Sequence, residues 1–320
     1  PWISYLMYLL LISIPTLVFI MGLSFLLMSV IRNQAVTFVI ILGYIGLTLF
    51  LIQDAYYYVF DYMAFNIPML RSEITGFGNL EVILGHRGIY FCLGIGFIFL
   101  TIFLLKRLPQ SESMTFISVV MSVLFIGAGG FLAFRHVNRF VQNDHHRTEA
   151  VSLNNRYAAL PVADVSKHDL RLKHKGKTIE VVSQMQLVNN SRQPIDSLVF
   201  NLNPGLEISS AKVEGLEIPV VRKKQLALLP LNKPMTGADT LTVDLAYAGA
   251  IDEAYCYLDI DNETQRQKYG EFVITIDKRF AFITPEYLLL TREAGWYPET
   301  GASFSTRNFG WNRVWITMFN

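Results

Sequence analysis

The distribution of apolar residues divides this chain of 320 residues into two parts of different character. Residues 5–31 contain no charged side chain, and three further long apolar stretches follow at 35–59, 89–105 and 114–134. A helix needs roughly 20 apolar residues to cross the hydrocarbon core of a bilayer. The four stretches therefore predict a membrane α-helical bundle of four transmembrane helices. The polar sequence after about Lys167 predicts a separate domain in water.

Alternation of apolar and polar residues in this second part is typical of half-buried strands. One face of a strand collects Leu241, Val243, Leu245 and Tyr247, and the same period recurs from Leu198 to Leu202. Turn sequences rich in Gly, Asn and Pro separate these runs. We therefore predict an all-β antiparallel sandwich or saddle-shaped domain at 166–320, joined by a polar, irregular linker at 139–165 to a transmembrane domain at 1–138.

Short loops that carry Lys or Arg are normally cytoplasmic. Arg32 follows the first stretch, and Lys106 and Arg107 follow the third, so both loops lie on one side of the bilayer. This pattern places the C-terminal domain on the exoplasmic side of the bilayer. Arg135 and Arg139, directly after the last stretch, count toward the opposite orientation.

The connection between the second and third stretches carries several polar residues. Acidic and basic groups inside a membrane are costly and often mark a transport path. Asp54, Arg71 and Glu73 are candidates for such a path. The alternative for Asp54 is an ordinary position at the membrane surface, because Tyr56, Tyr57 and Tyr58 resemble an interfacial aromatic belt.

The first two stretches resemble the membrane subunits of ABC-2 type transporters. The resemblance rests on the runs IPTLVFIMGLSF at 14–25 and RNQAVTF at 32–38. It implies alternating access, a homo- or heterodimer of permease halves, and a separate ATPase subunit that supplies ATP. The chain itself contains no nucleotide site, since the GKT sequence at 176–178 lacks the first glycine of a phosphate-binding loop and fits a hairpin turn better.

The C-terminal part resembles the N-terminal β domain of M1 aminopeptidases. The similarity rests on KHDLRL at 167–172, LVFNLNPGL at 198–206, FITPEY at 282–287 and GWYP at 295–298. Proteins of the Bacteroidetes group that fuse an ABC-2 permease to an M1-like region are similar in both parts. This resemblance implies a multi-pass protein of a bacterial inner membrane whose C-terminal domain lies in the periplasm. The resemblance implies that Glu286, Glu293, Trp296 and Tyr297 lie where this domain approaches a peptide, although packing is the better interpretation for Trp296 and Tyr297.

The zinc motif of M1 enzymes, His-Glu-x-x-His on a helix, does not occur in this sequence. A catalytic zinc needs three protein ligands and an open position, so we expect no catalytic residue, metal or cofactor here. The run Asp144, His145, His146 could bind a metal, but such exposed charged clusters are usually solvated. Because the chain begins in one apolar run and stops in strand-like sequence, we expect it to be an excerpt of a larger protein, whose zinc domain would follow Asn320.

The lipid bilayer is therefore the first predicted partner. A nucleic-acid partner is not expected, because the net charge is only +1 and no basic stripe offers a phosphate contact surface. The leading functional hypothesis is a permease component of an ABC-2-like exporter whose periplasmic β domain binds substrate or a partner. The alternatives are a membrane-anchored M1-type aminopeptidase and a structural scaffold of the cell envelope.

Overall fold

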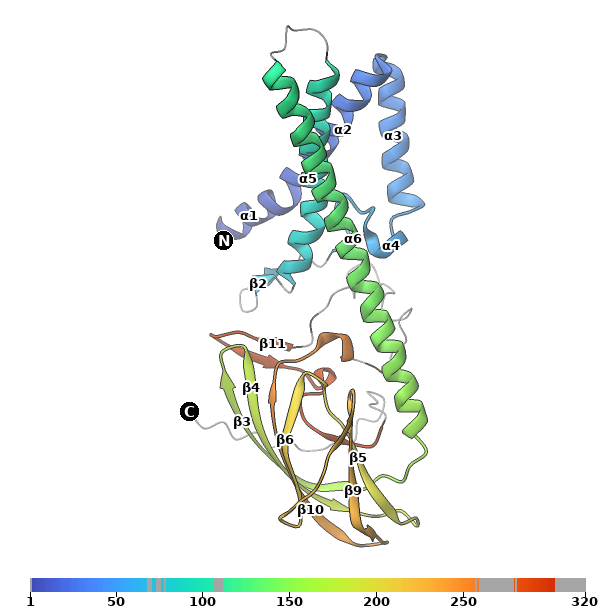
Figure 1. Cartoon of the computed structure of the whole chain (residues 1–320), viewed down its shortest axis with the longest axis vertical. Coiled ribbons are helices and arrows are strands. Elements are labelled where there is room, and N and C mark those ends of the chain that lie inside the picture. Colours follow the sequence, from blue (N-terminus) through green and yellow to red (C-terminus); the bar gives the residue numbers. More distant parts are fainter. Residues whose placement is uncertain are drawn as a thin grey trace. The chain divides into compact units, whose positions relative to one another are not determined.

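A computed structural model describes residues 2–67, 71–72, 76–77, 79–105, 112–256, 258, 279 and 281–302. The chain divides into two compact units, with a boundary between Gln142 and Asn143. The first unit is helical and the second is built from β-sheets, as Figure 1 shows.

The helical unit begins with a run of helix that changes its hydrogen-bond pattern midway. Its parts are α1 (Trp2–Tyr8), the π-helical segment η1 (Leu9–Ser13) and α2 (Ile14–Ile31). Arg32 then adopts a left-handed conformation with φ 56°, and the Asn33 side chain accepts hydrogen bonds from the backbone N–H groups of Ala35 and Val36. An Asn at this position is a good N-cap. The predicted tight turn between the first two helices is confirmed.

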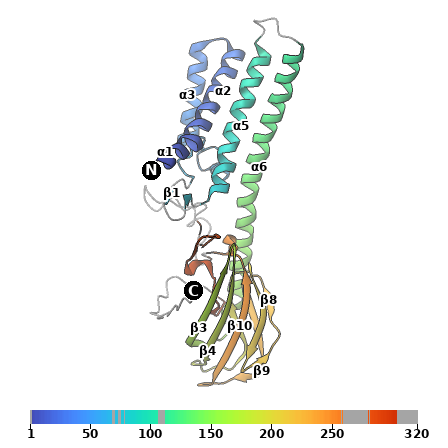
Figure 2. The ribbon, with the colours of Figure 1, turned by 90° about the vertical axis from the view of Figure 1, so that its left-hand side faces the viewer.

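The remaining helices are α3 (Gln34–Phe50), the short α4 (Ala55–Tyr58), α5 (Leu80–Leu104) and α6 (Glu112–Tyr157). Two short strands, β1 (Arg71–Ser72) and β2 (Gly76–Phe77), pair before α5. In Figure 2, α3, α2, α5 and the first part of α6 lie side by side. Many of their apolar side chains are exposed, as a lipid environment requires.

Three helical segments of the described chain are long and apolar enough to cross a membrane: Tyr5–Ile31, Leu80–Leu104 and Glu112–Tyr157. Three of the four predicted spans thus have sufficient length, and α3 as a fourth transmembrane helix stays a prediction. The second predicted span, 35–59, ends as a helix at Phe50, so α3 has only 17 residues. The helix does not continue to residue 59, because Tyr56, Tyr57 and Tyr58 all have positive φ values, which a right-handed α-helix cannot accommodate.

The third and fourth predicted spans have the right type and the wrong bounds. Helix α5 begins at Leu80 and not at 89, because Glu81 occupies its first turn and the apolar run of 82–84 continues the helical face. Helix α6 continues through 139–157, where the sequence predicts an irregular linker. Arg147, Ala150 and Asn154 recur at helical spacing and are buried, so packing within the second unit stabilises this polar sequence as a helix.

The second unit contains two antiparallel sheets. The first has the strand order β3 (Asp164–Lys175), β4 (Thr178–Val188), β10 (Thr240–Gly249), β6 (Leu206–Val213) and β7 (Leu216–Glu217). The second has the order β13 (Glu299–Thr300), β5 (Ile195–Asn201), β9 (Leu226–Met235) and β8 (Val221–Lys223). A further pair joins β11 (Ala281–Ile283) and β12 (Leu288–Leu290). Two 3-10 turns, η2 (Glu253–Tyr255) and η3 (Arg292–Ala294), complete the unit.

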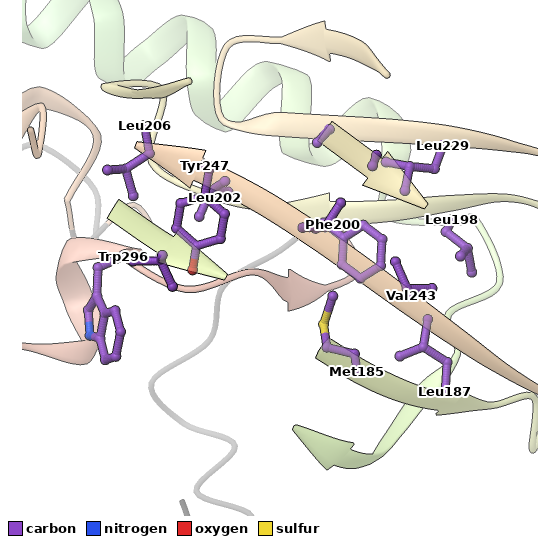
Figure 3. Packing of buried hydrophobic residues seen from close by; sticks show 14 of the residues in the cluster. Met185, Leu187, Leu198, Phe200, Leu202, Leu206, Leu229, Val243, Tyr247 and Trp296 are labelled. Carbon is purple, nitrogen blue, oxygen red and sulfur yellow. The ribbon is translucent and has the colours of Figure 1, made fainter. Parts of the chain in front are cut away.

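One hydrophobic core joins the two sheets, as Figure 3 shows. Met185 and Leu187 of β4 and Val243 of β10 enter it from one sheet, and Phe200 of β5 and Leu229 of β9 enter it from the other. The alternation predicted for 241–247 is confirmed. In 198–202 the alternate residues Leu198, Phe200 and Leu202 enter this core as predicted, but Val199 and Asn201 on the other face are buried as well. Residues 175–177 form the predicted hairpin turn between β3 and β4, so the phosphate-loop interpretation stays excluded.

The outer face of the four-stranded sheet is covered by the last turns of α6, all within the second unit. Gln225 donates from its Nε2 to the backbone oxygen of Ala150 at 2.8 Å and to Oδ1 of Asn154 at 2.7 Å. Arg147 donates to the backbone oxygen of Cys256 at 2.5 Å. Leu153 and Tyr157 of α6 also pack against the cluster that contains Val199, which explains why β5 is buried on both of its faces.

Candidate functional site

Ionisable and polar side chains gather in the interior of the helical unit. They come from the first turns of α5 (His86, Arg87 and Tyr90), from Asp61 in the preceding connection and from His136 of α6. His86 is fully buried, and Arg87 and Asp61 are each 2% exposed. Charged groups are rarely buried without a specific reason, most of all in a membrane protein. We call these five residues the polar centre.

Arg87 holds the π-helical segment. Its Nε donates to the backbone oxygen of Leu11 at 2.8 Å, and its Nη2 donates to the backbone oxygen of Ile12 at 3.2 Å and to Oγ1 of Thr16 at 2.6 Å. Its Nη1 donates to the backbone oxygen of Tyr62 at 2.8 Å. A π-helical turn interrupts the regular i to i−4 bonding, so carbonyl groups near it can accept from a side chain. The guanidinium group thus joins α5, η1 and the connection at 62.

All four acceptors of Arg87 are neutral. Among the described residues, no carboxylate lies within ion-pair distance of the guanidinium group, although Asp61 belongs to the same centre. Arginine stays charged inside proteins. The helical unit therefore contains a buried positive charge that is hydrogen-bonded and makes no direct ion pair among the described residues, and the buried Asp61 carboxylate interacts with it electrostatically.

Two histidines bind a left-handed segment of backbone, and a tyrosine binds the residue that follows it. Nε2 of His136 lies 2.9 Å from the backbone oxygen of Tyr57, and Nε2 of His86 lies 3.0 Å from that of Tyr58. The hydroxyl of Tyr90 donates to the backbone oxygen of Val59. Left-handed conformations cost roughly 1 kcal/mol or more per residue outside glycine, so this segment needs such contacts to persist.

Asp61 organises the next turn of the connection. Its carboxylate accepts from the backbone N–H groups of Phe65 at 3.1 Å and Asn66 at 2.7 Å, and from Nδ2 of Asn66 at 3.2 Å. Three buried atoms nearby, Tyr62 OH, Asn66 Oδ1 and His86 Nδ1, have no hydrogen-bond partner within the described part of the chain. Each could bind a polar group of a substrate, because leaving such an atom unpaired costs about 1–3 kcal/mol.

Of the three residues predicted to line a permease path, the structure describes the side chain of Asp54 alone. Asp54 is exposed in the turn before α4 and lies outside the polar centre. The backbone of Arg71 belongs to β1, and Glu73 lies outside the described residues. The interfacial interpretation of Asp54 and a transport role for these three residues both stay predictions.

The second unit shows where the predicted peptide contacts lie. Trp296 is 8% exposed and belongs to the hydrophobic core, and the Tyr297 ring lies 5.0 Å from the Trp296 ring, so both residues pack as expected. Glu286 is exposed between β11 and β12, and Glu293 is half-buried in η3. Contact of any of the four with a peptide stays a prediction.

His168 of β3 shares this environment. Its ring lies 6.0 Å from the Tyr297 ring, and its Nε2 lies 2.8 Å from Oγ of Ser183. Burial lowers the pKa of His168 to about 4, against a smaller raising effect of Asp169. Burial also raises the pKa of Tyr297, and Glu299 raises it further. Both side chains are therefore neutral near pH 7.

The histidine run at the unit boundary has a different third partner from the one predicted. Ligand atoms of His145, His146 and Glu149 lie within 4.8 Å of one another, whereas Asp144 is not part of the group. Lys224 forms an ion pair with Glu149, and both histidines are exposed. The carboxylate thus already has a cation, which agrees with the interpretation of a solvated cluster.

The sequence alone does not reveal the polar centre. A third span that begins at residue 89 leaves His86 and Arg87 in a loop. The apolar run of 82–84 before His86 is the one feature of the sequence that could have indicated the centre, since it extends the apolar helix to include His86 and Arg87. The partners of Arg87 lie 25 to 76 residues away and are mostly backbone atoms, which leave no mark in a sequence.

Comparisons with known proteins give a limited result. No protein-family profile matches the chain, and no curated protein matches it. Among solved structures, an M1 zinc metallopeptidase from Deinococcus radiodurans is similar over 28% of this chain and 21% of that protein, with 23% sequence identity and a TM-score of 0.26. A two-domain M1 zinc metallopeptidase variant bound to L-arginine is similar over 31% of this chain and 23% of its own, with 23% sequence identity and a TM-score of 0.27. The chain thus spans about a fifth of the length of these peptidases.

Proposed function

We propose that this chain is the membrane permease component of an ABC-2-like export system, and that its β unit binds substrate or a partner in the periplasm. The observation that supports the proposal is the buried Arg87, which contacts four neutral acceptors from three segments of the helical unit. A helix bundle that serves only as an anchor has no use for such a charge.

Burying a charge in a membrane is costly. An arginine at the centre of a membrane helix costs at least about 2.5 kcal/mol on insertion scales. One apolar helix is enough to anchor a domain, and an anchor gains nothing from this cost. A transport unit does gain, because a fixed cation with unpaired polar atoms beside it attracts a polar or anionic substrate group away from water.

The contact between α2 and α5 also suits a moving unit. A Cβ atom at Gly22 would lie 2.3 Å from the backbone oxygen of Gly94, so the two backbones meet directly. Small residues permit this close packing of membrane helices. Together with the bond from Arg87 of α5 to Thr16 of α2, the contact holds the two helices close together, which suits rocking motions in alternating access.

Transport in this scheme needs an ATPase, and the sequence provides no nucleotide site. We therefore infer that a separate ATPase subunit binds the cytoplasmic loops and that two permease halves assemble around the path. The β unit, on the opposite side, would receive, shield or dock the exported material.

Affinity capture of the natural full-length protein from native membranes, followed by mass spectrometry, tests the proposal. The expected result is a Walker-type ATPase in a fixed ratio to this protein. Two results would overturn it. Release of amino acids from peptides, sensitive to chelators and without an ATPase, identifies an anchored aminopeptidase. Stable envelope proteins without an ATPase identify a scaffold.

A further inference from the structure

A groove opens between α5 and α6 within the helical unit. It has a volume of about 310 Å³ and is lined by Glu81, Val82, Leu84, Gly85, Leu132, Arg135, His136 and Arg139. The two helices pack closely beside it, since a Cβ atom at Gly88 would lie 3.1 Å from the Leu132 side chain. The groove is therefore a feature of two adjoining helices and not of a loop.

The charged end of the groove lies where the apolar segment of α6 ends. Phe131 and Phe134 are exposed apolar residues, and Arg135 follows directly. Arg135 and Arg139 are four residues apart, so they lie on the same face of α6. This is the depth at which lipid headgroups meet the end of a membrane-spanning helix.

The groove has more positive than negative charge. Among the described residues that line it, Glu81 is the only carboxylate, and Oε1 of Glu81 lies 3.1 Å from Nη2 of Arg135 and 3.7 Å from Nη1 of Arg139. The side chains of Arg135 and Glu81 are 64% and 67% exposed, and that of Arg139 is 39% exposed. One carboxylate cannot use all the N–H donors of two guanidinium groups, about five on each, so most donors stay available to an anion.

The other end of the groove is apolar and open. Leu84 is half-exposed, Val82 and Leu132 form the wall, and a Cβ atom at Gly85 would meet nothing within 4 Å. His136 contributes no free donor from Nε2, which is bound to the backbone oxygen of Tyr57. A ligand that fits this groove has an anionic head and a hydrocarbon tail.

We propose that the α5–α6 groove binds an anionic glycerophospholipid, with its phosphate group at Arg135 and Arg139 and an acyl chain along Leu84, Gly85 and Leu132. Planar guanidinium groups bind phosphate oxygens in pairs, and basic pockets between membrane helices are suited to lipid headgroups. The inference requires the helical unit to lie in a bilayer, but it does not depend on transport. It also gives the two arginines after the last span a role other than setting orientation.

Lipid retention by the full chain tests this inference. The chain is reconstituted into nanodiscs of phosphatidylcholine with one-fifth phosphatidylglycerol, extracted into a neutral detergent and measured by native mass spectrometry. The expected result is one retained phosphatidylglycerol per chain. The R135Q/R139Q double variant should reduce its affinity about 30-fold, since each cation near the membrane surface contributes roughly 1 kcal/mol.

Three further variants distinguish specific lipid binding in the groove from nonspecific electrostatic attraction. E81Q should retain the lipid at least as well as the original chain, because it removes the competing carboxylate. G85L should lose it with all charges intact, because the new side chain fills the groove. R171Q/K173Q removes the same two charges from exposed positions of β3 and should have no effect.

Several results would overturn the inference: equal retention by the double arginine variant, equal retention of phosphatidylcholine, or release of the lipid by inorganic phosphate at millimolar concentration. The last result would mean that the groove binds phosphate alone. Thermal unfolding of each variant in detergent shows that its fold is intact. A variant that had merely lost its fold would lose the lipid, whereas E81Q is expected to retain it at least as well as the original chain.

Discussion

Replacement of Gly94 by alanine tests whether α2 and α5 meet backbone to backbone. The new Cβ atom would lie 2.6 Å from both the carbonyl carbon and the oxygen of Val18, and 2.7 Å from Cα of Phe19. These are main-chain atoms, which cannot rotate away. Because ordinary contact begins at 3.4 Å, the two helices must separate locally by about 0.8 Å.

This separation has an energetic cost. A gap of this size forfeits about a quarter to a half of the dispersion energy of the separated atoms, and overpacking in cores costs about 1–3 kcal/mol. We expect Gly94→Ala to lower the free energy of unfolding by about 2 kcal/mol or more. Reversible unfolding in sodium dodecyl sulfate, followed by far-ultraviolet circular dichroism, measures it.

The matched control is Gly46→Ala in α3, where a Cβ atom would meet nothing within 4 Å. Alanine favours a helix over glycine by up to about 1 kcal/mol, so this variant should be neutral or slightly stabilised. Equal free energies of unfolding for Gly94→Ala and Gly46→Ala would refute the close packing of α2 and α5.

Three other predictions concern single side chains. Arg87→Met should lower the free energy of unfolding by about 2–5 kcal/mol in the same assay, because it leaves four acceptors unpaired, and Arg87→Lys should restore part of it. Gln225→Leu should speed amide exchange at 147–154, where the side chain of Gln225 binds α6; unchanged exchange would contradict the packing of α6 on the second unit. The pKa of His168 is about 4 in the folded state, whereas an exposed histidine in the unfolded chain has a pKa of 6.5. The unfolded chain therefore binds the proton more strongly, so the free energy of unfolding should be highest above pH 6.5 and should fall by at most about 3 kcal/mol as the pH is lowered to 4. Amide exchange in β3 and β4 should show this loss, and His168→Phe should remove it.

The sequence predicts those features that depend on neighbouring residues. The turn at Arg32 and Asn33 follows from local capping, and the hairpin at 175–177 follows from a glycine, Gly176, with φ 61° between two alternating strands. The alternation of 241–247 likewise predicts which face of β10 is buried. In each case, the determining atoms lie within a few residues of one another.

The features that the sequence does not predict depend on distant partners. The helical form of 139–157 results from packing on β5 and on Gln225, which is about 70 residues away. The end of α3 at Phe50 depends on a left-handed segment that His86 and His136 hold from other helices. The polar centre itself consists largely of side chains bound to backbone oxygens, and any sequence supplies such oxygens. Periodicity and composition carry no record of these contacts.

The proposal of alternating access is tested most directly at Thr16, whose hydroxyl contacts Arg87 in the polar centre. A Thr16→Cys variant, with Cys92 replaced by alanine and the fully buried Cys256 retained, is labelled in native membrane vesicles with a membrane-impermeant maleimide. Alternating access predicts that the labelling rate changes severalfold when ATP and vanadate are added. The same rate with and without nucleotide would contradict a transport path through this centre.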